Sequence, residues 1–231
     1  MVGEQSFLDF KCPHCGETVS FPETDIGQPR DCPGCLQTLI VPEAGSESGR
    51  LLPLPITTAR LSLRRFKSSD SEDLLAVMSD ESLFLYTNDF PLDEETLLRW
   101  LESDESVRLT TPGERFFLGI ELKEGGNVIG YAWLNRREWE ADLFIRLHRD
   151  YQKKALALEA MEGVLGFCFE GIRIHRVTAL CDSRNVAACH LFERLGLRRE
   201  GEFIKSKWAD GQWANTVLYA ALEEEWNAKG E

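Results

Sequence analysis

Two matching pairs of cysteines constrain the start of the chain more strongly than any other feature. Each pair has the form Cys-Pro-x-Cys, and sixteen residues separate the two pairs. Thiolates at this spacing can close a tetrahedral zinc site. Because four protein ligands leave no open position on the metal, a structural site is predicted at Cys12, Cys15, Cys32 and Cys35. His14, inside the first pair, is interpreted as a bystander.

The cysteines define a small unit over residues 1–43. Short apolar stretches at 6–10, 18–21 and 38–41 are predicted strands. A unit of this size buries too little surface to fold alone, so the metal would supply most of its folding free energy. Residues 44–56 are rich in Gly, Ser, Glu and Pro, a composition that disfavours packing and predicts a linker. A larger domain is then expected over 57–231.

The larger domain alternates between strand and helix patterns. Strands are expected around Leu61 and Leu63 and at 116–122, 128–134, 141–147, 177–181, 202–208 and 213–220. Helices are expected from Ser69 or Asp70 through Met78, at 93–101, from Lys154 to about Phe169, and at 185–195. The dipeptides Gly125-Gly126 and Asp210-Gly211 indicate hairpin turns. This order predicts a mixed α/β sheet flanked by helices.

Charge and cysteine usage limit the classes of partner. The net charge is −13, and the first fifty residues contribute eight acidic against three basic side chains. Such a surface repels nucleic acid and anionic lipid and favours cationic partners. The sequence contains no long apolar run and no secretory pattern at its start, so we expect no membrane span. Seven cysteines, an odd number, argue for metal binding in a reducing cytoplasm rather than for a disulfide framework.

The segment YQKKALALEA, residues 151–160, follows a predicted strand and begins a predicted helix. The first turn of a helix has N–H groups without partners and a positive dipole end, which suit a pyrophosphate. Ala155 stands where glycine would most naturally permit close approach of a phosphate. An ordinary basic loop at the start of a core helix is an equal alternative for this segment alone.

Several pieces of the larger domain carry a family resemblance. TTARLSLRRF, NVIGYAWL, DSRNVAACHLFERLGLRREGEF and ADGQWANTVLYAALEEEW occur in the order of the first strand, third strand, fifth strand with fourth helix, and closing hairpin of GNAT-type acetyltransferases. The domain most resembles the branch that includes the ribosomal-protein N-terminal acetyltransferases. The first forty residues resemble small zinc ribbons of the form CPxC…CPxC.

The GNAT resemblance implies a splayed mixed sheet and acetyl-CoA as the acyl donor. It implies that the fourth strand pairs with the pantetheine arm through Ile145, Arg146 and Leu147, and that Asn185 lies near that arm. Helix capping by Asn185 is an alternative that is nearly as well supported. The pyrophosphate loop of the form Gln/Arg-x-x-Gly-x-Gly/Ala maps onto Gln152, Lys153, Lys154, Ala155, Leu156 and Ala157.

Ala155 is the one departure in this loop. Its methyl group either displaces the pyrophosphate or is accommodated by a right-handed backbone. Lys153 and Lys154 add positive charge beside the phosphates.

The implied reaction is direct attack of a primary amine on the thioester within a ternary complex. The acceptor is expected to be a protein N-terminus or a small cationic amine. An α-amino group has a pKa of about 8 and needs only a weak base. Asp142 maps onto the acidic position of the family's fourth strand and is the candidate base, although a solvated strand carboxylate is the more common role of a single Asp.

Two positions depart from the family where a proton donor is expected. Phe192 replaces a tyrosine common in the fourth helix, and Ala188 replaces the serine of Asn-x-x-Ser. Water can protonate a thiolate whose pKa is about 8.5, so activity does not require either residue. The alternative is a catalytically impaired acetyltransferase fold that binds CoA or a partner and is docked through its zinc ribbon. Under the enzyme hypothesis the ribbon is either a structural or a partner-docking appendage, so a protein partner of the ribbon is a candidate under both hypotheses.

Overall fold

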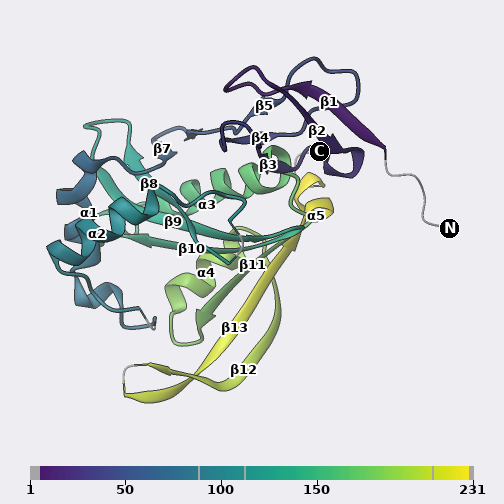
Figure 1. Cartoon of the computed structure of the whole chain (residues 1–231). Coiled ribbons are helices and arrows are strands. Elements are labelled where there is room, and N and C mark those ends of the chain that lie inside the picture. The colour runs from purple at the N-terminus through teal and green to yellow at the C-terminus, as the bar shows by residue number, and fades with distance from the viewer. Residues whose placement is uncertain (1–5, 88, 112, 210, 229–231) are drawn as a thin grey trace.

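A computed structural model describes residues 6–87, 89–111, 113–209 and 211–228, arranged as a small N-terminal unit on top of a larger sheet (Figure 1). The small unit contains β1 (Phe7–Lys11), β2 (Thr18–Pro22), β3 (Pro29–Asp31), β4 (Thr38–Ile40) and β5 (Arg50–Leu51). β1 pairs with β2, and β3, β4 and β5 form a second antiparallel sheet. We call residues 6–43 the ribbon. Its core contains Phe10, Val19, Leu39 and Val41 around two buried cysteines.

The larger domain is built on one eight-stranded sheet. Its strands are β6 (Ile56–Thr57), β7 (Leu61–Arg64), β8 (Phe116–Leu122), β9 (Val128–Arg137), β10 (Glu140–Leu147), β11 (Arg176–Asp182), β12 (Arg198–Ala209) and β13 (Gln212–Leu222). Their spatial order is β12-β13-β11-β10-β9-β8-β7-β6. Neighbours are antiparallel except β10 and β11, which are parallel. The predicted mixed α/β class is confirmed.

Helices cover both faces of this sheet. The helices are α1 (Ser71–Met78), α2 (Glu94–Asp104), α3 (Leu156–Gly166), α4 (Val186–Arg194) and α5 (Glu223–Asn227). Leu74 of α1 and Leu97 of α2 pack on one face against Val128 and Tyr131. Met161 of α3 packs in the main core on the other face, as does Phe192 of α4. Among the described residues, no helix is long and apolar enough to cross a lipid bilayer.

The predicted elements are found within a few residues of their expected bounds. Local signals explain this agreement: Asp93 caps α2 by accepting a hydrogen bond from the Thr96 N–H, and Gly196 ends α4 with a φ of 75°. The elements that were not predicted include β3, β5, β6 and α5, and the helix expected to end near Phe169 continues as a π-helical turn to Gly171. Asp210 of the closing turn lies outside the described residues, whereas Gly211 has the expected positive φ of 68°.

Residues 44–56, expected to be a loosely packed linker, are held on both sides. The N–H of Gly49 donates to the carbonyl of Lys11, and Leu51 pairs with Leu39 in the ribbon. Leu52 and Leu54 pack against the main core of the larger domain. The expectation of loose packing, which came from composition, is wrong because two leucines alternate with the prolines and provide apolar surface to bury. The connection therefore fixes the ribbon against the sheet.

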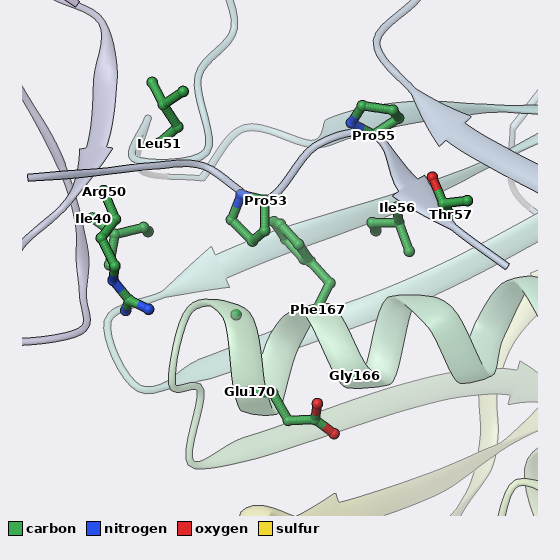
Figure 2. Close-up of a pocket in the computed structure, with 11 residues that line it drawn as sticks. Ile40, Arg50, Leu51, Pro53, Pro55, Ile56, Thr57, Gly166, Phe167 and Glu170 are labelled. Carbon is green, nitrogen blue, oxygen red and sulfur yellow. The ribbon is translucent and has the colours of Figure 1, made fainter. Parts of the chain in front are cut away.

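A cavity of about 420 Å³ lies between this connection and the end of α3 (Figure 2). Phe167 points from the helix toward Pro53, and Arg50 and Glu170 lie near its margins (Figure 2). An eleven-residue helix is about 16 Å long, so this cavity is well separated from the N-terminal end of α3, where the phosphate loop is predicted.

Candidate active site

The two central parallel strands diverge, and this divergence organises the site. β10 pairs with β11 only at three positions, from Glu140 opposite Arg176 to Asp142 opposite Thr178. β10 continues to Leu147 along β9, and β11 continues to Asp182 along β13. Within the described residues, the edge of β10 that faces β11 therefore has no partner strand beyond Asp142. Its backbone N–H and C=O groups need other partners, and an extended amide-containing ligand would supply them.

The candidate pantetheine residues occupy this unpaired part of β10. Ile145 is half-buried against the core on the α3 side, and Leu147 is buried there. Arg146 points to the opposite face and is only 5% exposed. The His148 N–H donates to the Ile129 carbonyl of β9, so the alternation of strand hydrogen bonds directs the backbone of Arg146 to β9 and that of Ile145 and Leu147 to the edge facing β11. The Leu147 carbonyl accepts a hydrogen bond from Nε2 of Gln152 at 3.1 Å, which ties the following loop to the strand.

The loop between β10 and α3 has an unusual backbone. A 3-10 turn at Arg149–Tyr151 is followed by Lys153 with a φ of 59° and Ala155 with a φ of 58° and a ψ of 12°. Ala155 is thus left-handed, and the alternative that a right-handed backbone accommodates its methyl group is wrong. The position explains why the family uses glycine there, because a left-handed residue with a Cβ costs about 1–2 kcal/mol.

The loop leads directly into the first turn of α3. The Glu159 N–H donates to the Ala155 carbonyl, which starts the helical ladder. The N–H groups of Leu156, Ala157 and Leu158 precede that bond and have no intrahelical acceptor. Leu156 is buried, whereas Lys153 and Lys154 are exposed. The geometry gives an anion a cluster of N–H donors with two lysines beside it.

Arg60 holds this loop from behind, a role that the sequence did not indicate. Its Nη1 donates to the Lys154 carbonyl at 3.1 Å, and its Nε and backbone N–H each donate to the Glu159 carboxylate at 2.6 Å. Thr58 donates to the same carboxylate at 2.6 Å. Burial opposes ionisation of Glu159, but these hydrogen bonds hold its pKa below the usual range.

Asp142, the candidate base, stands on the last paired rung of β10 and β11. Its carboxylate accepts a hydrogen bond from the Thr178 hydroxyl and forms an ion pair with Arg137. The side chain is half-buried and belongs to the same face of the strand as Arg146. Asp142 therefore lies where the two strands are still paired, and its carboxylate already contacts two donors, the Thr178 hydroxyl and the Arg137 guanidinium.

Asn185 and Phe192 lie on the far side of the divergence. Asn185 caps α4 by accepting a hydrogen bond from the Ala188 N–H at 3.1 Å, so the capping alternative is borne out by geometry. The Phe192 ring is buried, 5.5 Å from the Tyr219 ring. The Tyr219 hydroxyl donates to Glu193 at 3.1 Å, and burial raises its pKa. The structure thus brings a phenol from β13 close to Phe192, a contact that the sequence did not indicate.

Two free thiols also line this side. Sγ of Cys181 on β11 lies 3.6 Å from Sγ of Cys189 on α4, and both residues are half-buried. Burial first, and then the neighbouring Cys189 thiol, raises the pKa of Cys181. The shift keeps Cys181 protonated at neutral pH and fits the expectation that it is a packing residue.

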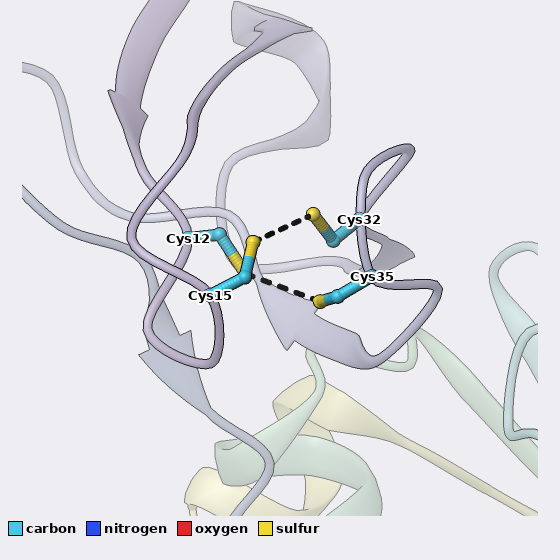
Figure 3. A group of neighbouring side chains, drawn as sticks. All are labelled: Cys12, Cys15, Cys32 and Cys35. Atoms are coloured by element: carbon cyan, nitrogen blue, oxygen red, sulfur yellow. Dashed lines mark hydrogen bonds between the residues drawn. The ribbon is translucent and has the colours of Figure 1, made fainter.

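The predicted metal ligands come together in the ribbon (Figure 3). Sγ of Cys12 lies 3.8 Å from that of Cys35, and Sγ of Cys15 lies 3.8 Å from that of Cys32. All four sulfurs are within 4.8 Å of one another. A tetrahedral zinc with Zn–S bonds of about 2.3 Å requires sulfurs about 3.8 Å apart. The sulfur–sulfur distances of the cluster are therefore those of a four-cysteine zinc site.

The pKa values of these thiols are also consistent with a bound metal cation. Burial opposes ionisation of Cys12, but N–H groups of Cys15 and His14 contribute to holding its pKa at about 7. An N–H at Glu17 favours the Cys15 thiolate, yet burial and the three neighbouring thiols raise its pKa to about 12. Four thiolates this close need a bound positive charge to ionise together. The His14 ring lies within hydrogen-bond distance of the Thr38 carbonyl, at 3.1 Å, consistent with a bystander.

Comparison with known proteins places this geometry in a family. The family model described as "Acetyltransferase (GNAT) domain" matches residues 60–198, more than half of the chain. The uncharacterized N-acetyltransferase YnaD of Bacillus subtilis (strain 168) is 27% identical over 74% of this chain and 99% of its own. The ribosomal protein uS5-alanine N-acetyltransferase of Escherichia coli (strain K12) is 28% identical over 49% of this chain and 61% of its own.

Solved structures share the fold. A spermidine N-acetyltransferase from Vibrio cholerae in complex with CoA and spermine superposes with a TM-score of 0.65 and 18% identity, covering 73% of this chain and 99% of that chain. Three observations support the same assignment: the divergence of β10 and β11, the loop at the start of α3, and the family-model match over residues 60–198. The chain therefore belongs to the GNAT family of acetyltransferases and is an acetyl-CoA-dependent N-acetyltransferase that carries an N-terminal four-cysteine cluster of zinc-ribbon type.

Proposed function

We propose that acetyl-CoA binds with its pyrophosphate on residues 152–157 and its pantetheine arm along Ile145–Leu147 of β10. The observation that carries this proposal is the end of β10–β11 pairing at Asp142, close to a loop that opens α3 with unpartnered N–H groups. Lys153 and Lys154 would neutralise part of the phosphate charge. Asn185, which caps α4, would lie beside the arm on the opposite wall.

The acceptor is a primary amine that attacks the thioester carbonyl directly. The new C–N bond forms, the C–S bond breaks, and the amine proton leaves to a base. Asp142 is our candidate base, acting through water, because it is the carboxylate on β10 at the point of divergence. The CoA thiolate has a pKa of about 8.5 and takes its proton from solvent. Relatives named for an alanine of ribosomal protein uS5 and for spermidine support the two proposed acceptor classes, a protein N-terminus and a small cationic amine.

The four-cysteine cluster would hold a structural zinc ion whose chemistry is to cross-link the two knuckles of the ribbon. Four sulfur ligands leave it no position for substrate. Such thiolates persist in a reducing compartment, which supports a cytoplasmic location. A protein partner of the ribbon remains part of the proposal.

Steady-state turnover tests this function. The zinc-loaded chain is mixed with acetyl-CoA and a panel of amines, and thiol release is followed. We expect release that depends on the amine and falls at least tenfold in Asp142→Asn, with acetyl-CoA affinity unchanged. Glu72→Gln, an exposed carboxylate on α1, is the control. Turnover at the background rate for every amine would contradict the proposal.

The second candidate function is an impaired enzyme that binds CoA or a partner. The buried Phe192 and the half-buried Ala188 favour it, because neither supplies a proton at its expected position. A rise in melting temperature with acetyl-CoA, without thiol release on any amine, would support this alternative over the enzyme.

A further inference from the structure

The segment between α1 and α2 crosses the divergence of β10 and β11. We call residues 84–87 the strap. On the β10 side, the Thr87 hydroxyl accepts a hydrogen bond from Nη2 of Arg146 at 3.1 Å. On the other side, the Tyr86 carbonyl accepts from Nζ of Lys207 at 2.7 Å, and the Arg184 guanidinium lies 5.8 Å from the Tyr86 ring. The strap therefore reaches from the end of β10 to the turn after β11.

The charges around the strap differ in sign from the rest of the chain. The group comprises four cations and two carboxylates: Arg115, Arg146, Arg184 and Lys207 with Asp89 and Asp182. The chain as a whole carries a net charge of −13. Asp142 on β10 forms an ion pair with Arg137, and Asp80 after α1 forms one with Arg149, so neither pair changes the positive balance of this group. The surface around the strap, where it crosses the divergence of β10 and β11, is therefore locally cationic.

Arg146 is a buried cation of this group whose side-chain hydrogen bonds go to neutral hydroxyl groups. The residue is 5% exposed, and its guanidinium lies 3.8 Å above the Phe84 ring and donates to the Tyr131 hydroxyl. Among the described residues, its ion-pair partner is Asp89, whose Oδ2 lies 3.8 Å from Nη2 of Arg146. Asp89 is itself shared with Arg115 at 3.5 Å. A buried guanidinium is costly without close pairing, so this group would gain from another anion.

Lys207 shows the same lack of compensation. Burial is the main cause that lowers its pKa, and Arg184 adds to it, while Asp182 and Asp89 act in the opposite direction. Asp182 is already bound to Arg184 at 2.8 Å. An additional carboxylate between Lys207 and Arg146 would stabilise both cations, whereas a polyamine would add further positive charge beside them.

We propose that the acceptor amine carries a carboxylate, which binds between the Lys207 side of the strap and the Arg115–Arg146 side. The inference rests on the proposed acetyl transfer and narrows its substrate class. A free α-amino acid and a peptide with an acidic residue near its N-terminus share this chemistry. Spermidine and other polyamines do not have it, in spite of the acidic charge of the whole chain.

Matched acceptor pairs test the inference on the zinc-loaded full chain with saturating acetyl-CoA. One pair is alanine and alaninamide; the other is a peptide beginning Ser-Asp-Glu and its Ser-Asn-Gln counterpart. We expect kcat/KM to be at least about tenfold higher for the carboxylate member of one pair, and the pair that discriminates identifies the source. Equal kcat/KM within both pairs, or a higher value for spermidine, would overturn the inference.

Variants locate the effect. Lys207→Gln and Arg115→Gln should reduce the preference for the carboxylate member several-fold, whereas Lys205→Gln, exposed on the same hairpin, should leave it unchanged. Loss of preference in all three variants, or in none, would contradict the assignment. Turnover of no amine would also overturn the inference, and calorimetry of acetyl-CoA binding would then show whether the donor site fails with it.

Discussion

The side-chain oxygen of Gln28 accepts a hydrogen bond from Nη2 of Arg136 at 2.8 Å, which joins the ribbon to β9 of the acetyltransferase sheet. Nε2 of the same amide donates to the Arg173 carbonyl, and Gln28 is 1% exposed. Asp31 of the ribbon also accepts a hydrogen bond from Thr110 at 2.7 Å. The ribbon is therefore a packed part of the enzyme rather than a tethered appendage.

Replacing Gln28 by Ala should weaken this contact. Arg136 is half-buried, and this burial lowers its pKa to about 10, so loss of its partner leaves a poorly solvated cation. We expect the free energy of unfolding of the zinc-loaded chain to fall by about 1–3 kcal/mol, measured by urea titration. Gln37→Ala, an exposed glutamine in the ribbon, should change it by less than about 0.5 kcal/mol. Equal effects of the two substitutions would contradict the bridging role.

Arg60→Ala tests how the phosphate loop is held. The substitution removes the donor to the Lys154 carbonyl and the ion pair with Glu159, so the loop loses its support from behind. We expect the Kd for acetyl-CoA, measured by calorimetry, to rise about fivefold or more because the loop must be ordered on binding. Arg99→Ala, an exposed arginine on α2, is the control and should leave Kd unchanged. An unaltered Kd in Arg60→Ala would exclude the positioning role.

Ala155→Gly tests the left-handed backbone. Relief of the left-handed strain is worth about 1–2 kcal/mol, and the greater unfolded-state freedom of glycine offsets about 0.5–1 kcal/mol of it. A net gain of about 0.5–1 kcal/mol in the free energy of unfolding is expected, with acetyl-CoA bound at least as tightly. Ala157→Gly, two residues on in the right-handed helix, should instead lose about 1 kcal/mol. Destabilisation by both substitutions would argue against a left-handed Ala155.

The lowered pKa of Glu159 predicts that the free energy of unfolding depends on pH. Its folded-state pKa lies below the ordinary value of 4.5, so its contribution to stability is fully present above pH 4.5 and is lost as the pH falls through the folded pKa. Urea titrations of wild type and Glu159→Gln should therefore differ most at neutral pH and converge as the pH falls through the folded-state pKa of Glu159. A difference that grows on acidification would reverse the sign and contradict the hydrogen-bonding assignment.

The sequence predicted features that local chemistry determines. The Cys-Pro-x-Cys spacing indicated the sulfur cluster, the Gly125-Gly126 hairpin signal indicated Phe116–Leu122, and Asp93 marked the start of α2. Each of these signals lies within a few residues of the element that it specifies.

Features that depend on distant residues were missed. Arg60 meets Glu159 across 99 positions, and Gln28 meets Arg136 across 108, with no local pattern to announce either contact. The left-handed Ala155 was missed for another reason: alanine prefers the right-handed region, and the tertiary contacts of the loop override that preference. Leu54 likewise packs in a stretch whose composition indicated a linker.

Hydrogen–deuterium exchange of the zinc-loaded chain, with and without saturating acetyl-CoA, tests the central claim most directly. The account predicts slower exchange in peptides that cover residues 143–147 of β10 and 152–158 of the loop and first turn of α3, because these amides become bound or shielded. Unchanged exchange in both segments, or protection confined to the cavity beside Pro53 and Phe167, would contradict the proposed acetyl-CoA site.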